Sequence, residues 1–197
     1  MLKTIAAKRT KGFVAALIGG GLLILSLSLL LEQVVFSATV SLTATVGTSI
    51  TCTLSTSTTA FGTLTTGAVT TAVPNVTSTV TTNDGLGFTL NISDTGLATS
   101  SPAYTIASTT GVLAAGTEGW GIQATTTTGG SGGTVTLLAK YNVSGNTVGS
   151  VGASAVLASS TVAVTSRNIL VSHLAAISAS TQAGSYSDTI TYSCTGN

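Results

Sequence analysis

Apolar and polar residues alternate with a period of two along most of the chain after residue 38. Such alternation is typical of β-strands that have one face on a core and the other face in water. The clearest example is residues 184–194, which predict the last strand of the domain. Its inward face carries Tyr186, Ile190, Tyr192 and Cys194.

The same alternation begins directly after residue 38. One stretch alternates Val40, Leu42, Ala44 and Val46 with Ser and Thr, and the next alternates Ile50, Cys52 and Leu54 with Thr. The two stretches predict two short strands, or one strand bent at Gly47. Cys52 is therefore expected to face the core.

Two further stretches, residues 76–82 and residues 88–92, alternate on either side of Asn83-Asp84-Gly85. An Asp-Gly pair suits the positive φ angles of a tight turn. The pattern predicts a β-hairpin over residues 76–93, with Gly85 at positive φ.

Strand-like stretches continue around Tyr104, Trp120, Val135, Val162 and Ile169, and glycine-rich and serine-rich loops separate them. No window after residue 38 shows the apolar spacing of three and four residues that an amphipathic helix needs. Eight to ten short strands are expected. We predict an all-β fold, an antiparallel β-sandwich of immunoglobulin-like or Greek-key type, preceded by one N-terminal hydrophobic helix.

Four basic residues precede an uncharged apolar run over residues 13–31. Nineteen apolar residues nearly span a bilayer, and the basic flank would stay in the cytoplasm. Residues 1–37 are therefore interpreted as a signal peptide, cleaved near Ala38, or as a retained N-terminal membrane anchor. Under both interpretations residues 38–197 form an exported domain at the cell surface or outside the cell.

A third interpretation of the N-terminus starts from Lys11-Gly12-Phe13. A basic residue, glycine and phenylalanine before an apolar helix resemble the processing site of type IV pilins. That family has a glutamate five residues into the mature helix, where this chain has Leu17. The resemblance implies a type IV pilin-like subunit.

Charged residues make up only 6% of the chain, and the mean hydropathy is +0.58. Thr and Val favour strands, and the 23 glycines favour turns. After Leu31 only Lys140 and Arg167 oppose the five acidic residues, so the exported body is mildly acidic. This charge balance offers no basic surface for nucleic acid.

The residue types that enzymes and metal sites need are scarce. The only histidine is His173, which we interpret as a surface or strand-end imidazole rather than a catalytic base. Two distant cysteines and one histidine do not make a zinc site. We therefore expect no enzymatic activity, no resident metal and no cofactor.

Three other features have both a structural and a functional interpretation. Calcium is conceivable at Asp84 with Asn83 or at Asp94 with Asn91, but turn formation explains both pairs better. Trp120 alternates with Ile122, which favours a core position over a sugar-stacking one. An exposed Trp120 beside Asp84 or Glu118 would instead favour a carbohydrate-binding or calcium-assisted module.

The two cysteines, Cys52 and Cys194, lie on the apolar faces of the first and last predicted strands. In an exported chain such a pair is expected to form a disulfide. An intermolecular bridge and two buried thiols are the alternatives. An intramolecular bridge requires the first and last strands to lie next to each other.

The order of several short motifs resembles a broad group of bacterial surface β-sandwiches. The motifs are Cys52, Phe61-Gly62-Thr63-Leu64-Thr65, Val80-Thr81-Thr82-Asn83, Gly87-Phe88-Thr89-Leu90 and Ala183-Gly184-Ser185-Tyr186 with Asp188-Thr189-Ile190-Thr191-Tyr192. The group includes spore-coat-U-type domains, archaic chaperone–usher pilin domains and WxL cell-wall domains. Trp120-Gly121-Ile122 has isoleucine where WxL domains have leucine, and Tyr192 replaces their second tryptophan. These departures count against the peptidoglycan binding that the WxL family would imply.

Together these features predict a non-enzymatic structural or adhesive protein of the cell surface, working in a coat, a fibre or a wall layer. Its expected partners are further copies of itself or other surface proteins, with cell-wall polysaccharide as a further candidate, and a membrane through residues 13–31. The alternatives are a carbohydrate-binding or calcium-assisted ligand module and a type IV pilin-like subunit. The sequence names no ligand.

Overall fold

The computed structural model describes residues 39–100, 103–127 and 129–197. The predicted N-terminal helix, the apolar run over residues 13–31 and the Lys11-Gly12-Phe13 motif lie outside these residues. Within them, no helix is long and apolar enough to cross a membrane.

The described residues form antiparallel β-sheets and no α-helix, which confirms the predicted all-β class. Every pairing between named strands is antiparallel. The strands are β1 Ile50–Leu54, β2 Thr70–Thr71, β3 Val76–Thr82, β4 Phe88–Ser93, β5 Leu97–Ser100, β6 Ala103–Ile106, β7 Gly111–Val112, β8 Gly119–Thr126, β9 Ser131–Gly132, β10 Thr136–Leu137, β11 Thr147–Val148, β12 Ala155–Ser160, β13 Val164–Ala176 and β14 Thr191–Gly196.

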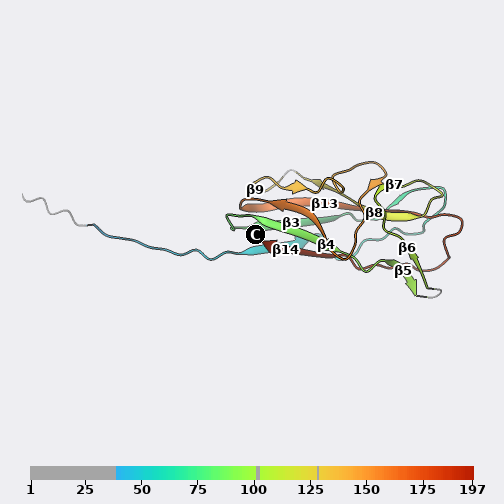
Figure 1. Cartoon of the computed structure of the whole chain (residues 1–197), viewed down its shortest axis with the longest axis horizontal. Helices are drawn as coiled ribbons and strands as arrows, with labels where there is room; N and C mark the ends of the chain where they lie inside the picture. Colours follow the sequence, from blue (N-terminus) through green and yellow to red (C-terminus); the bar gives the residue numbers. More distant parts are fainter. Residues whose placement is uncertain (1–38, 101–102, 128) are drawn as a thin grey trace, which may run out of the picture. The chain divides into compact units, whose positions relative to one another are not determined.

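The larger of the two main sheets is built around the long strand β13 (Figure 1). Strands β3 and β2 pair with one side of β13, β8 and β9 pair with the other side, and β1 pairs with β3. The smaller main sheet has the order β10-β12-β4-β14. Two short two-stranded sheets, β5 with β6 and β7 with β11, complete the set.

Both main sheets contribute to one hydrophobic core. Its buried side chains include Val80 from β3, Leu90 from β4, Leu157 from β12 and Ile169 from β13. Strands β3 and β4 bury alternate residues, as period-two amphipathic strands must when only one face meets a core. The two sheets therefore pack on a shared core, an arrangement consistent with the predicted β-sandwich.

The predicted hairpin over residues 76–93 is wrong. Strand β3 belongs to the larger sheet and β4 to the smaller one, so the intervening turn carries the chain from one sheet to the other. The Asn83 side chain holds the turn on the larger sheet: it accepts a hydrogen bond from Ser49 N (2.6 Å) and donates one to Gly47 O (2.9 Å). Alternation alone fixes the strand type but not the sheet that a strand joins.

The glycine at positive φ in this turn is Gly87, with φ of 84°, and not the predicted Gly85. Gly87 is buried, and an added Cβ would overlap the backbone of Ser160 at the end of β12. Gly85 lies in open space. The close approach of two backbones, which the sequence does not reveal, explains which glycine the turn needs.

The last strand is shorter than predicted, because β14 begins only at Thr191. The predicted facing is nevertheless correct. Tyr186, Ile190, Tyr192 and Cys194 are all half-buried and pack against the core. Residues 184–190 thus keep the alternation without pairing as a regular strand.

The prediction of a strand at residues 40–46 is wrong, whereas the one at residues 50–54 is correct. Residues 39–49 form neither strand nor helix in the structure, and all of them are exposed. Residues 46–197 make up one compact unit, and residues 39–45 belong to a separate unit. Residues 40–46 thus have the alternation of a strand but pair with no strand among the described residues.

Candidate functional site

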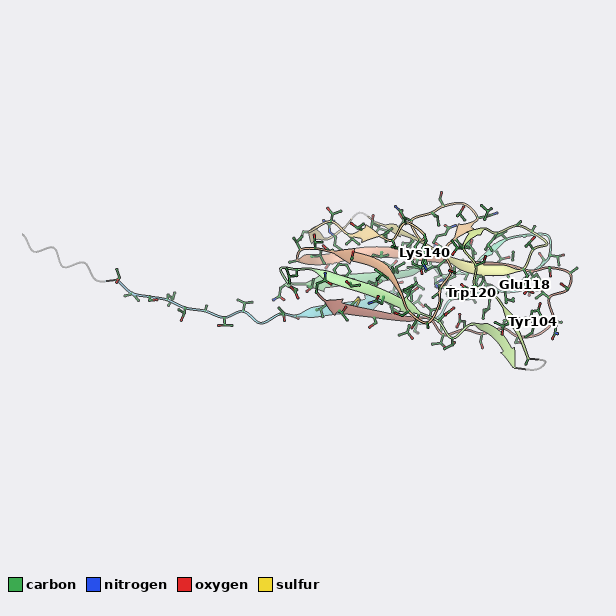
Figure 2. All side chains as sticks on the ribbon, viewed as in Figure 1. Tyr104, Glu118, Trp120 and Lys140 are labelled. Atoms are coloured by element: carbon green, nitrogen blue, oxygen red, sulfur yellow. A yellow bond between two sulfur atoms is a disulfide. The ribbon has the colours of Figure 1, made fainter. Side chains whose placement is uncertain are left out.

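One group of polar contacts lies where the segment after β13 meets β6 and the start of β8. The Glu118 carboxylate accepts hydrogen bonds from Tyr104 Oη (2.9 Å) and Thr181 Oγ1 (2.5 Å). The Tyr186 ring meets the Tyr104 ring edge to face, with centroids 6.4 Å apart. We call these four residues the rim cluster, and Figure 2 shows its members Tyr104 and Glu118 near one another.

Both tyrosines of the rim cluster stay protonated at neutral pH. The hydrogen bond to Glu118 raises the pKa of Tyr104, and desolvation together with the Glu118 charge raises the pKa of Tyr186. Tyr186 Oη donates to Gln182 O (2.7 Å). The cluster therefore places two neutral phenols around one carboxylate, and its hydrogen bonds connect the segment after β13 to β6 and to the start of β8.

The single histidine is buried between the sheets, contrary to the predicted surface position. His173 is only 4% exposed. Strand β13 continues past this residue to Ala176, so His173 lies within the strand and on its core side. Its Nε2 lies 3.5 Å from Tyr192 Oη of β14. Desolvation lowers the pKa of His173 to about 4, although the nearby Asp188 charge acts to raise it.

Neither member of the His173–Tyr192 pair is charged at neutral pH, because burial also raises the pKa of Tyr192. The described residues bring no serine, threonine or cysteine into hydrogen-bond contact with the imidazole. The pair instead links β13 of one sheet to β14 of the other.

Three polar atoms around this pair are buried and have no hydrogen-bond partner in the described part of the chain: Trp120 Nε1, His173 Nδ1 and Asp188 Oδ2. Trp120 is 2% exposed, which confirms its predicted core position, and Figure 2 marks its place. The other oxygen of Asp188 accepts bonds from the backbone and side chain of Thr95 and from Thr189 N.

Among the described residues, no three His, Cys, Asp or Glu side chains come together as metal ligands. Asp84 Oδ1 accepts a hydrogen bond from Leu86 N (2.9 Å). Asp94 is half-buried, and desolvation together with the Asp188 charge raises its pKa. The carboxylates considered for calcium thus lie in separate turns.

A shallow groove of about 420 Å³ lies on the outward side of β8 and β13. It is lined by Gln123, Ala124, Thr125, Asn142, Val143, Ser144, Leu170 and Ser172. Amides and hydroxyls without a charged group are chemistry suited to a neutral polar ligand.

Arg167, the only arginine after Leu31, stabilises a loop. Arg167 donates three hydrogen bonds, at 3.0–3.1 Å, to the carbonyls of Gly129, Gly132 and Gly133. A second hollow of about 180 Å³ lies beside it. The guanidinium therefore holds the glycine-rich loop against the edge of the larger sheet.

The structure joins Cys52 and Cys194 in a disulfide with Cα atoms 6.2 Å apart. Cys52 lies opposite Val80 in the register, so it faces inward as predicted, yet it is exposed because β1 is the last strand of its sheet. Cys194 is half-buried against the core. The bridge links the two sheets at their common edge.

The apolar side chains before β1 are the most exposed in the described chain. Val40 is 91% exposed, Leu42 94% and Val46 83%. Together with Ala44 they alternate with Ser and Thr, and no charge interrupts them. We call residues 39–46 the donor segment.

Comparison of the chain with protein-family models, curated proteins and solved structures finds no match. The structure brings Cys52 to Cys194 and His173 to Tyr192, and it buries Trp120. The rim cluster was missed by sequence reasoning, because its four residues come from separate elements with no common spacing.

Proposed function

We propose that this chain is a non-enzymatic structural or adhesive protein of the cell surface, exported with residues 1–37 as signal peptide or anchor. Its domain, an immunoglobulin-like β-sandwich in this proposal, assembles with other copies when the donor segment of one copy adds as a strand to a sheet edge of the next. The observation that carries the proposal is the exposed, alternating apolar surface of the donor segment.

Exposure of this kind is costly in a protein that stays monomeric. Burying one Val or Leu side chain is worth about 1.5–3 kcal/mol, and the donor segment holds three such residues with exposures of 83–94%. A strand added to a sheet edge gains main-chain hydrogen bonds while alternate side chains enter pockets. Period-two alternation of apolar and hydroxyl residues is the pattern that such an addition requires.

The edge formed by β10 and β12, called here the acceptor edge, is the more open of the two edges of the smaller sheet. Strand β10 covers β12 at only two positions, whereas β14 at the opposite edge is tied to β1 by the disulfide. Leu138 and Val156 at the acceptor edge are 43% and 39% exposed. Strand β10 has neither charge nor proline and leaves most of β12 without a partner on this side, so the uncovered part of β12 is open to pairing with another chain.

The outward faces of both sheets support close packing of copies. One row across the smaller sheet runs Thr136, Ser159, Thr89 and Thr195, and β1 and β3 pair Thr51 with Thr81 and Thr53 with Thr79. These positions carry hydroxyl groups and no charge. Neighbouring copies can therefore approach without electrostatic repulsion.

The test compares Leu42→Asp with Ser41→Asp in the full-length chain, kept in a nonionic detergent. Both variants add one carboxylate at neighbouring positions, but only Leu42 lies on the apolar face of the donor segment. Sedimentation velocity should show assemblies for the native chain and for Ser41→Asp, and a single copy for Leu42→Asp. Equal sedimentation of the two variants would contradict strand addition.

Binding of a neutral polysaccharide is a second candidate, favoured by the uncharged groove over β8 and β13. Gln123 and Asn142 would supply amide contacts to sugar hydroxyls. Replacing both by alanine should abolish co-sedimentation with isolated wall polysaccharide and leave self-assembly unchanged. Unchanged co-sedimentation would remove this candidate.

A further inference from the structure

Strand β1 is held to the domain by few noncovalent contacts. Four of its five residues are exposed, and only Ile50 is half-buried against the core. It pairs with β3 over five register positions, and β3 is its only partner strand in the described chain. Each backbone hydrogen bond contributes little net free energy, and no fully buried side chain adds to these bonds.

Strand β14, which carries the other cysteine, is also an edge strand with one partner, but it makes more contacts with the core. It pairs with the central strand β4 over six register positions. Tyr192 and Cys194 pack against the core from β14, and Tyr192 also contacts His173. The bridge thus connects β1, which packs one half-buried side chain against the core, to β14, which packs two.

The donor segment leads directly into β1 through residues 47–49. The Asn83 side chain fastens Gly47 and Ser49, and the Thr82 hydroxyl donates to Ser49 O (2.9 Å). Tension on the donor segment therefore loads these hydrogen bonds first, and β1 next. Beyond β1 it passes either through the hydrogen bonds to β3 or through the covalent bridge.

We propose that the Cys52–Cys194 disulfide is a tension-bearing lock, which keeps β1 in place when the donor segment is pulled and passes the load to β14 in the other sheet. The proposal rests on the proposed function for the source of the tension. The bridge closes a loop with a sequence separation of 142 residues, so it removes nearly the whole domain from the load path.

Single-molecule pulling on the full-length chain, with handles at its two ends, tests the lock. The native chain is compared with the double variant that carries both Cys52→Ser and Cys194→Ser. The variant should extend further by about 470–510 Å, the contour of 142 residues, and should release β1 in a first step at lower force than the remainder. Equal final extension in the two chains, or no early step for β1, would overturn the proposal.

Hydrogen exchange without load separates a lock on β1 from a general effect on stability. In the double variant the amides of β1 should lose more protection than those of β13, which report on unfolding of the whole domain. Equal loss in both strands would overturn the lock. If the double variant does not fold, the folded native protein is reduced with a small thiol, which can reach the exposed Cys52. The loss of amide protection in β1 is then compared with the loss in β13 as before.

These measurements need only one copy of the chain. Equal sedimentation of Leu42→Asp and Ser41→Asp would therefore contradict assembly without changing the exchange result. A missing early step for β1 would contradict the lock without changing assembly.

Discussion

Strands β13 and β1 belong to the same sheet but differ sharply in how they are enclosed. Strand β13 runs for 13 residues with partner strands on both sides, and its last four residues are all buried. Strand β1 has five residues, one partner strand, and four exposed side chains. The difference in burial teaches that the side chains of β13 contribute far more to the core than those of β1, although the two strands belong to one sheet.

The bridge is the largest single contribution expected from the β1 side. On the chain-entropy model, closing a loop with a separation of 142 residues stabilises the domain by about 4–5 kcal/mol. Cys52→Ser and Cys194→Ser should therefore destabilise equally, and the double variant should be no worse than either. Chemical denaturation of the oxidised proteins measures this, and unequal single variants would show that one cysteine has a separate role.

Matched truncations measure the contrast between the two strands directly. Ile169 in β13 is fully buried, whereas Leu54 in β1 is 42% exposed. Ile169→Ala should lower the free energy of unfolding by about 2–5 kcal/mol through lost burial and the cavity left behind. Leu54→Ala should lower it by less than about 1 kcal/mol. Similar losses for the two variants in denaturant titrations would show that β1 is part of the core.

The buried His173 gives the β13 region a pH dependence. Its pKa is about 4 in the folded domain and near 6.5 in the unfolded chain, so below pH 6.5 the unfolded chain binds a proton that the folded domain does not. Stability should be complete above pH 6.5 and should fall by about 3 kcal/mol as the pH drops to 4. His173→Gln should remove this decline, and an identical pH profile for that variant would place the titration elsewhere.

The same contrast between enclosed and open positions occurs within one turn. Gly87→Ala places a Cβ against the backbone of Ser160 at a positive φ and should cost about 1–3 kcal/mol. Gly85→Ala meets no atom within 4 Å and should be close to neutral. Thermal melting of the two variants measures the difference, and a reversed order would contradict the path of the chain between the sheets.

Period-two alternation was sufficient to predict the strand class, the facing of Tyr186, Ile190 and Tyr192, and the core position of Trp120. Alternation is a local property, so it does not tell which strands become neighbours. For that reason it failed for residues 76–93, whose two strands join different sheets. It also failed for His173, because its burial depends on the full length of β13.

The donor segment is a second case in which alternation does not identify the pairing partner. Residues 40–46 carry the alternation of a strand, but local pattern does not state whether the pairing partner lies in the same chain. The rim cluster is a different case, because Tyr104, Glu118, Thr181 and Tyr186 meet only through tertiary packing.

Mixing two variants of the full-length chain tests strand addition most directly. Leu42→Asp blocks the donor segment but leaves the acceptor edge intact, whereas Thr136→Lys places a charge at the acceptor edge and leaves the donor segment intact. Each variant alone should sediment as a single copy, and an equimolar mixture should form a one-to-one complex that grows no further. A mixture that stays monomeric, or assembly of Leu42→Asp on its own, would contradict assembly through residues 39–46, whereas assembly of Thr136→Lys on its own would exclude the acceptor edge.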